Sequence, residues 1–150
     1  MRLSPVPVIS VKKAFEINSV KYNIFPTNLN LDQNDLINKV KEVQQLFQAK
    51  MHILFVNTHG NFQRDKEINE SLEQFAHHFN FSDYTLIIRN DLYEEFGIIN
   101  YAQEINADFI VMCTHGRRGI AHLFIGSIAE DVMKNVDCAL WIYKFKTNQK

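Results

Sequence analysis

The chain has 150 residues, of which 46% are hydrophobic, enough to bury one core and too few for two complete domains. Its net charge of -1 provides no overall field that would attract nucleic acid or an anionic membrane, so any anion site must be local. The N-terminus lacks the apolar run of a signal peptide, and no stretch is long and apolar enough for a membrane span. Cys113 and Cys138 lack the spacing of a disulfide framework or a zinc site. We therefore expect a cytoplasmic protein in a reducing compartment, with neither nucleic acid nor membrane as a partner.

The first half of the chain predicts two strands, each followed by a helix. Tyr22–Pro26 is the first strand, and from near Asp32 apolar residues recur at three-to-four spacing. That spacing predicts one apolar helix face made of Leu36, Ile37, Val40, Val43, Leu46 and Phe47. Met51–Val56 is a nearly unbroken apolar run, typical of a strand covered on both faces. A second amphipathic helix follows, with Ile68, Leu72, Phe75, Ala76 and Phe79 on its apolar face.

The second half repeats this alternation and ends on a strand. Tyr84–Ile88 predicts the third strand, and Asp91 is the expected N-cap of a helix whose apolar residues are Phe96, Ile99, Ala102 and Ile105. Phe109–Cys113 predicts the fourth strand. After a loop that contains glycines, Ser127 is the expected cap of a last helix, and Ala139–Tyr143 predicts the fifth strand.

Strands that alternate with helices are joined by right-handed crossovers, which gives a mostly parallel sheet. We therefore expect an α/β fold, a three-layer α/β/α sandwich over residues 20–146, with a five-stranded sheet in the order 3-2-1-4-5. In such sheets ligands bind outside the carboxyl ends of the strands, where the winding direction reverses.

Residues 1–13 do not fit this alternation. Pro7–Lys12 resembles Ala139–Lys144 in its apolar pattern and in its closing lysine, so this arm resembles the last strand of a preceding domain. We expect it to lie antiparallel against Ala139–Tyr143 of its own or a neighbouring chain, as an extra edge strand that covers an exposed edge. The alternative is a flexible arm.

Three of the five glycines lie in the loop between the fourth strand and the last helix. Glycine permits close backbone approach, and the N–H groups of Gly126, Ser127 and Ile128 at a helix start can bind a phosphate-sized anion. Arg117 and Arg118 can add positive charge. The loop is neither a Walker A motif nor GxGxxG, and glycines before a helix also occur for packing and capping alone.

The order and spacing of these residues resemble the universal stress protein family, whose nucleotide-binding members carry G-x2-G-x9-G-S/T at this place. Here the pattern reads Cys113-Thr114-His115-Gly116, then nine residues, then Gly126-Ser127, so Cys113 stands at the first glycine. The family's P-T-D after the first strand, whose Asp holds ribose, is matched by Pro26-Thr27-Asn28. Asn keeps a carbonyl acceptor for a ribose hydroxyl but loses the charge.

This resemblance implies a site for ATP or AMP, with or without Mg²⁺. The adenine would lie against backbone near Val56, and phosphates would meet the glycine loop. The implied nucleotide-binding residues are Pro26, Thr27, Asn28, Val56, Met112, Cys113, His115, Gly116, Arg117, Gly126, Ser127 and Ile128.

The leading functional hypothesis is therefore a regulatory module of the stress response that binds ATP or AMP, with slow hydrolysis at most and no assigned catalytic residue. The alternatives are a nucleotide-free domain that acts through homodimer or tandem pairing along Ala139–Tyr143, and an adenylyl- or phosphoryl-transfer enzyme of related topology. A helix start near Cys113 also suggests a lowered thiol pKa and a redox role. The alternative, which we favour, is that Cys113 is a small buried residue of the strand. The six scattered histidines predict no metal site.

Overall fold

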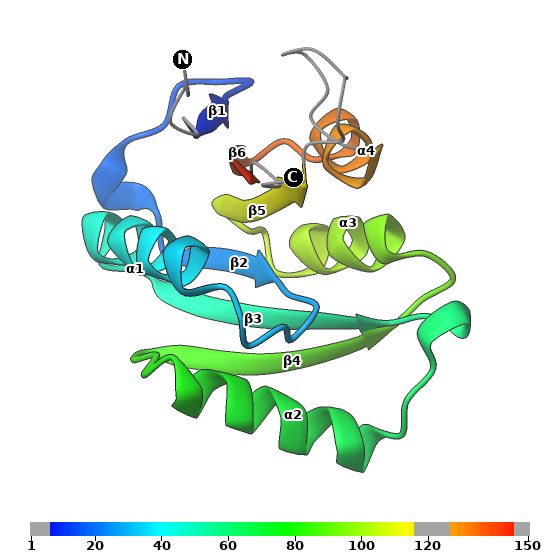
Figure 1. The fold of residues 1–150 in the computed structure, drawn as a ribbon. Coiled ribbons are helices and arrows are strands. Elements are labelled where there is room, and N and C mark those ends of the chain that lie inside the picture. The colour runs from blue at the N-terminus through cyan, green and yellow to red at the C-terminus, as the bar shows by residue number, and fades with distance from the viewer. Residues whose placement is uncertain (1–6, 116–126, 146–150) are drawn as a thin grey trace, which may run out of the picture.

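The computed structural model describes residues 7–115 and 127–145, which form the six strands and four α-helices drawn in Figure 1. The strands are β1 (Val8–Ser10), β2 (Tyr22–Pro26), β3 (Lys50–Asn57), β4 (Tyr84–Asn90), β5 (Phe109–His115) and β6 (Ala139–Phe145). The helices are α1 (Asn34–Phe47), α2 (Asp65–His78), α3 (Glu94–Glu104) and α4 (Ser127–Asn135), with short 3₁₀ turns η1 (Ile17–Ser19) and η2 (His59–Asn61). The predicted α/β class is confirmed. None of the helices in these two ranges has the length and apolar character needed to cross a membrane.

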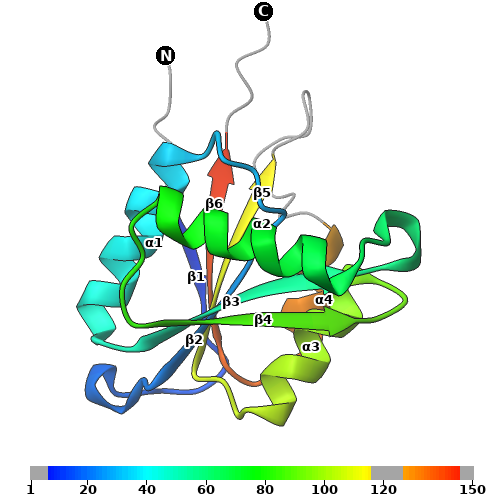
Figure 2. The ribbon, with the colours of Figure 1, turned by 90° about the horizontal axis from the view of Figure 1, so that it is seen from below.

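All six strands belong to one mixed sheet with the order β1-β6-β5-β2-β3-β4. Strands β2 to β6 pair in parallel, and β1 alone is antiparallel. The sheet twists strongly, so that β3 and β4 run across the direction of β5 and β6 in Figure 2. A sixth strand therefore extends the expected five-stranded sheet.

Strand β1 is the N-terminal arm, and the predicted antiparallel pairing with the last strand is confirmed within the same chain. Val8 lies opposite Ile142, Ile9 opposite Trp141 and Ser10 opposite Leu140. Lys12 Nζ donates a hydrogen bond to the Lys134 carbonyl at the end of α4, over 3.4 Å. The edge of β6 that would otherwise be open is thus occupied by β1.

Two buried clusters lie on opposite faces of the sheet. Successive strand residues alternate between them, so Phe25 faces the cluster beneath α1 and α2, whereas Ile24 faces the cluster beneath α3 and α4. On each face the helices contribute the apolar stripe that the sequence predicts, such as Leu36, Ile37 and Val40 of α1. These are the three layers of a sandwich.

Two apolar residues predicted on buried helix faces are in fact exposed. Leu46 of α1 is 62% exposed and Phe96 of α3 is 45% exposed. In α1 the buried position is taken by Gln44, whose Nε2 lies within hydrogen-bonding distance of the Ala49, Ser82 and Asp83 carbonyls. The prediction was wrong here because hydrogen bonding makes a polar residue fit the buried stripe.

The expected N-cap of α3 was also wrong. The helix begins at Glu94, after Tyr93, and Tyr93 makes no side-chain cap. Asp91 lies three residues earlier, where Oδ1 accepts from the Leu92 N–H at 2.8 Å and Oδ2 accepts from Asn100 Nδ2 at 3.1 Å. Its carboxylate thus braces the turn into α3 from outside the helix.

Two buried asparagines on neighbouring strands differ in their hydrogen bonding. Asn23 of β2 is 0% exposed, and neither side-chain atom has a partner among the described residues. Asn57 of β3 donates to the Gln63 carbonyl and to Asn90 Oδ1 and accepts from the Gln63 N–H. A buried unpaired amide costs about 1–3 kcal/mol, whereas a satisfied one contributes to stability.

We predict that Asn23→Leu raises the free energy of unfolding by about 1 kcal/mol, and that the matched change Asn57→Leu lowers it by about 2 kcal/mol or more. Urea unfolding of the two variants measures this difference. A loss of stability in Asn23→Leu similar to that in Asn57→Leu would show that an internal water satisfies the Asn23 amide, contrary to the prediction.

Candidate functional site

The centre of the sheet contains the point where its winding direction reverses. The crossover after β2 places α1 on one face, and the crossover after β5 places α4 on the other. Strands β2 and β5 are neighbours, yet their ladder has only two register pairs, Asn23 with Phe109 and Ile24 with Ile110. Beyond these pairs β2 and β5 are no longer paired, and the carboxyl ends of strands at such a reversal are where open α/β sheets bind ligands.

The loop after β2 is held by a backbone bond to β3 and by bonds from its own side chains. The Thr27 N–H donates to the Leu54 carbonyl at 2.9 Å, and Thr27 Oγ1 accepts from the Leu29 N–H at 3.0 Å. Asn28 Oδ1 accepts from the Asn30 N–H at 3.1 Å and from Gln33 Nε2 at 3.4 Å. The Asn28 oxygen expected to accept from a ribose hydroxyl is therefore already engaged within the loop.

The β3 side is formed by Val56, which is buried and packs in the cluster beneath α3. Helix α3 approaches it at Gly97, where an added Cβ would lie 2.5 Å from Val56 Cγ1. Only glycine permits this approach without displacement of the neighbour. The contact fixes the first turns of α3 against the carboxyl end of β3.

The β5 side carries Met112 and Cys113, which alternate between the two faces. Met112 is buried in the cluster beneath α3 and α4, whereas Cys113 is half-buried and packs against the cluster beneath α1 and α2. Burial, followed by the negative charge of Glu94, raises the pKa of the Cys113 thiol to about 11. The alternative of a lowered pKa and a redox role is therefore wrong, because a thiol with a raised pKa is protonated at neutral pH and poorly suited to redox chemistry.

The remaining predicted site residues are only partly described. His115 is the last residue of β5, and Ser127 and Ile128 begin α4, with Ser127 exposed. Gly116, Arg117 and Gly126 lie outside the described residues. The structure thus brings Pro26, Thr27, Asn28, Val56, Met112 and Cys113 to the carboxyl edge of three adjacent strands.

Glu94 is a residue of this edge that the sequence indicates only as an acid on a solvated helix face, with no role in the site. It lies in the first turn of α3, three residues before Gly97, and is only partly exposed. Burial, and then the neighbouring charge of Glu95, raise the pKa of its carboxyl group. The available signal was its helical spacing to the buried residues Gly97 and Ile98, which puts Glu94 on the buried face.

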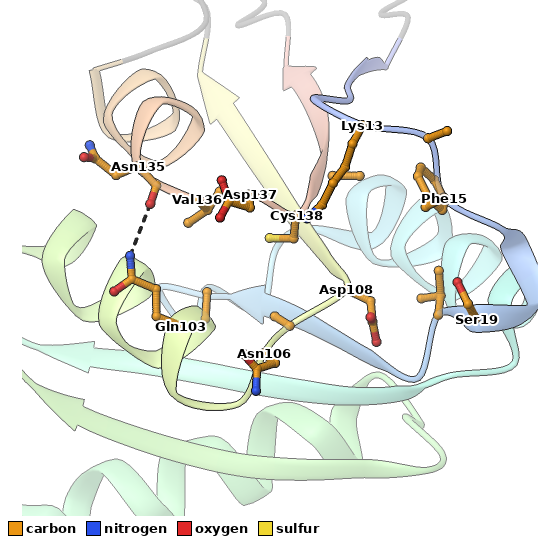
Figure 3. Close-up of a pocket in the computed structure, with 15 residues that line it drawn as sticks. Lys13, Phe15, Ser19, Gln103, Asn106, Asp108, Asn135, Val136, Asp137 and Cys138 are labelled. Carbon is orange, nitrogen blue, oxygen red and sulfur yellow. Dashed lines mark hydrogen bonds between the residues drawn. The ribbon is translucent and has the colours of Figure 1, made fainter.

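A cavity of about 400 Å³ lies at the other end of the strands, next to Val20, Asp108 and Cys138, which precede β2, β5 and β6. Figure 3 shows the Gln103 Nε2 to Asn135 carbonyl bond at its wall. Asp108 Oδ2 accepts from the Lys21 and Tyr22 N–H groups at 2.9 and 3.1 Å. These bonds join connecting segments, and the cavity is at the opposite end of the strands from the predicted site residues.

The histidine of β3 takes part in a structural contact. His52 Nδ1 lies 2.6 Å from the Tyr101 hydroxyl, and burial followed by the charge of Lys50 lowers the pKa of His52. Within residues 7–115 and 127–145, no three His, Cys, Asp or Glu side chains are grouped so that they could hold a metal ion.

Known proteins share both sequence features and the fold with this chain. The family model described as the universal stress protein family matches residues 24–144. A universal stress protein of Methanocaldococcus jannaschii is 40% identical over 47 residues, which make up 31% of this chain and 28% of that protein.

Solved universal stress proteins have a similar fold. One from Archaeoglobus fulgidus superposes with a TM-score of 0.70 at 19% identity, covering 97% of this chain and 52% of that one, so the present chain spans about half its length. A universal stress protein in complex with cAMP gives 0.66 at 15% identity, covering 85% and 98%. An Archaeoglobus fulgidus protein in complex with dAMP gives 0.60 at 16% identity, covering 83% and 98%.

We predict that Glu94→Gln stabilises the fold at neutral pH. Because the pKa of Glu94 is raised in the folded state, the folded state binds the proton more tightly than the unfolded chain, and ionisation above the ordinary pKa of 4.5 lowers stability. The gain should be present near pH 7 and vanish at a pH well below 4.5. Thermal unfolding across this range measures it.

Glu67→Gln is the matched control, because Glu67 is an exposed acid in the first turn of α2. It removes the same favourable charge from a helix start without relieving burial, so it should give no gain. Equal effects of the two substitutions would contradict the burial argument.

Proposed function

This chain belongs to the universal stress protein family, and we propose that it is a regulatory module of the stress response that binds an adenine nucleotide, ATP or AMP. The observation that carries the proposal is that Pro26, Asn28, Val56 and Met112 lie at the carboxyl edge of three adjacent strands, where the winding of the sheet reverses. Relatives of the same fold solved with cAMP and dAMP support an adenine nucleotide as the ligand.

In this proposal each strand end contributes one part of the site. Backbone at Val56 meets the adenine, the Pro26-Thr27-Asn28 loop lies beside the ribose, and Met112, Cys113 and His115 lead into the phosphate loop. Gly116, Arg117 and Gly126 meet the phosphates together with the first N–H groups of α4, at Ser127 and Ile128. A helix start suits an anion because its N–H groups are unpaired and its dipole is positive there.

The proposal includes a cytoplasmic location. It assigns no catalytic residue, so we expect any ATP hydrolysis to be slow. Mg²⁺ would enter with ATP, held by the phosphates. Regulation then consists of a change in stability or partner contacts when the nucleotide binds.

A second proposal concerns partners, and β1 favours it. Strand β1 occupies the edge of β6, where the last strand of a neighbouring domain would pair. Residues 1–13 would therefore be the last strand of a preceding domain, or would take the place of the last strand of a second copy. Val8, Ile9 and Val11 of this arm are all exposed apolar residues, as expected of a strand covered by a neighbour. Tandem or homodimer pairing along Ala139–Tyr143 thus requires β1 to belong to that neighbour or to be displaced.

The nucleotide proposal predicts that AMP or Mg-ATP at 100 times its dissociation constant stabilises the chain by about 2.7 kcal/mol. The unfolding midpoint then rises by roughly 5–10 °C. Ser127→Asp should abolish this shift, because Asp still suits a helix start but repels phosphate there. Thermal unfolding with and without each nucleotide is the measurement.

Ser127→Thr serves as the control and should keep the shift, since it retains the hydroxyl. No shift for either nucleotide in the unmodified chain would sink the nucleotide proposal and favour the nucleotide-free alternative.

The partner proposal predicts that deletion of residues 1–12 leaves the β6 edge open and produces a dimer through Ala139–Tyr143. Light scattering after size exclusion, with the intact chain at the same concentration as control, gives the mass. A deletion variant that remains folded and monomeric at high micromolar concentration would contradict pairing along the last strand.

A further inference from the structure

Glu94 lies in the first turn of α3, on the same side of the sheet as the loop after β2 where the ribose is expected. The first turns of α3 are fixed against the carboxyl end of β3 by the contact between Gly97 and Val56. Glu94 precedes Gly97 by three residues and therefore lies on the same helix face. Figure 1 shows α3 beginning on the arrowhead side of β3 and β4.

The position of Glu94 is also constrained from the β5 side. Its negative charge contributes to the raised pKa of Cys113, so Glu94 is within electrostatic reach of the carboxyl end of β5. The Gly97 contact with Val56 keeps the start of α3 near the carboxyl end of β3. Strand β2 runs between β3 and β5 in the sheet, so Glu94 is on the side of the sheet where β2 ends.

The carboxylate of Glu94 has no hydrogen-bond or ion-pair partner within residues 7–115 and 127–145. The two ion pairs of these residues join Lys39 to Glu42 and Arg89 to Glu104. A partly buried carboxylate without a partner lowers stability when it is ionised. Acids kept at such a cost to stability are characteristic of functional sites.

The loop after β2 supplies less than a ribose needs. Asn28 has no charge, and its Oδ1 already accepts from the Asn30 N–H and from Gln33 Nε2. A carboxylate has two oxygens and about four acceptor positions, so it can accept from two neighbouring hydroxyls at once. Hydrogen bonds to charged groups are also stronger than those to a neutral amide.

From this arrangement we infer that Glu94, and not Asn28, accepts the hydrogen bonds of the nucleotide's ribose hydroxyls. The inference rests on the proposed nucleotide site. It makes Glu94 the residue that distinguishes ribonucleotides from 2′-deoxyribonucleotides in this chain, and it moves the acceptor from the β2 loop to the first turn of α3.

The test compares the affinities of AMP and dAMP, measured by calorimetry, for the unmodified chain, Glu94→Gln and Glu95→Gln. The unmodified chain should bind AMP about tenfold more tightly than dAMP, as one charge-assisted hydrogen bond allows. Glu94→Gln should weaken AMP binding by about tenfold and bring the AMP to dAMP ratio near one.

Glu95→Gln controls for charge, because it removes a neighbouring negative charge from the same helix turn. Loss of a nearby negative charge should by Coulomb attraction strengthen, not weaken, the binding of a phosphate-bearing ligand. Weakening in Glu94→Gln with none in Glu95→Gln is therefore specific to the hydrogen bonds. Unchanged unfolding at pH 7, or the gain expected above, shows that Glu94→Gln is folded.

Each other result overturns the inference in a recognisable way. An unchanged AMP to dAMP ratio in Glu94→Gln, with AMP still bound, refutes the ribose assignment and leaves the proposed function intact. Equal weakening of AMP and dAMP places Glu94 against the base or phosphate instead. No AMP binding by the unmodified chain overturns the proposed function and this assignment together.

Discussion

The divergence of β2 from β5 is the constraint on which the rest of the structure depends. Right-handed crossovers require the chain to turn to one face after β2 and to the other after β5. Helices α1 and α4 therefore pack on opposite faces of the sheet. The same constraint gives the sheet two helical layers and gathers backbone and side chains from several strand ends at one edge, where sheets of this kind bind ligands.

The edge of the sheet next to β6 shows how the chain manages unpaired backbone. Strand β6 contributes Leu140, Trp141 and Ile142 to the two buried clusters, so both of its faces are covered by the core. Its hydrogen-bonding edge is covered by three residues of β1. This cover is short and presents exposed apolar side chains outwards. The arm therefore covers the backbone edge of β6 but makes β1 the new edge strand. An edge strand can pair with another chain, so the arm affects how copies of the chain could assemble.

The spacing of apolar residues predicts which segments are helices and which are strands, because burial of one face or of both leaves a pattern within a few neighbouring residues. The alternation of strands and helices, the apolar stripe of α1 and the pairing of Pro7–Lys12 with the last strand were all available from the sequence. The placement of Gln44, Asp91 and Leu46 was not, because it depends on carbonyls and carboxylates that only the folded chain brings together. The predicted site residues at strand ends could be placed at the carboxyl edge from the predicted topology. The hydrogen bonding of Asn28 and the pKa of Cys113 could not be predicted, because both depend on neighbours that only the fold brings close.

Cys113 shows how the core can accommodate a side chain at a glycine position of the motif. A side chain at the first glycine position adds volume, and the sequence alone gives no direction for it. In the structure Cys113 packs with the cluster beneath α1 and α2, against which Leu29 and Leu31 also pack, while its strand neighbour Met112 faces the opposite cluster. The added atoms therefore extend the core beneath the β2 loop. Burial keeps the thiol neutral, so Cys113 adds no second negative charge to that of Glu94 at this edge of the sheet.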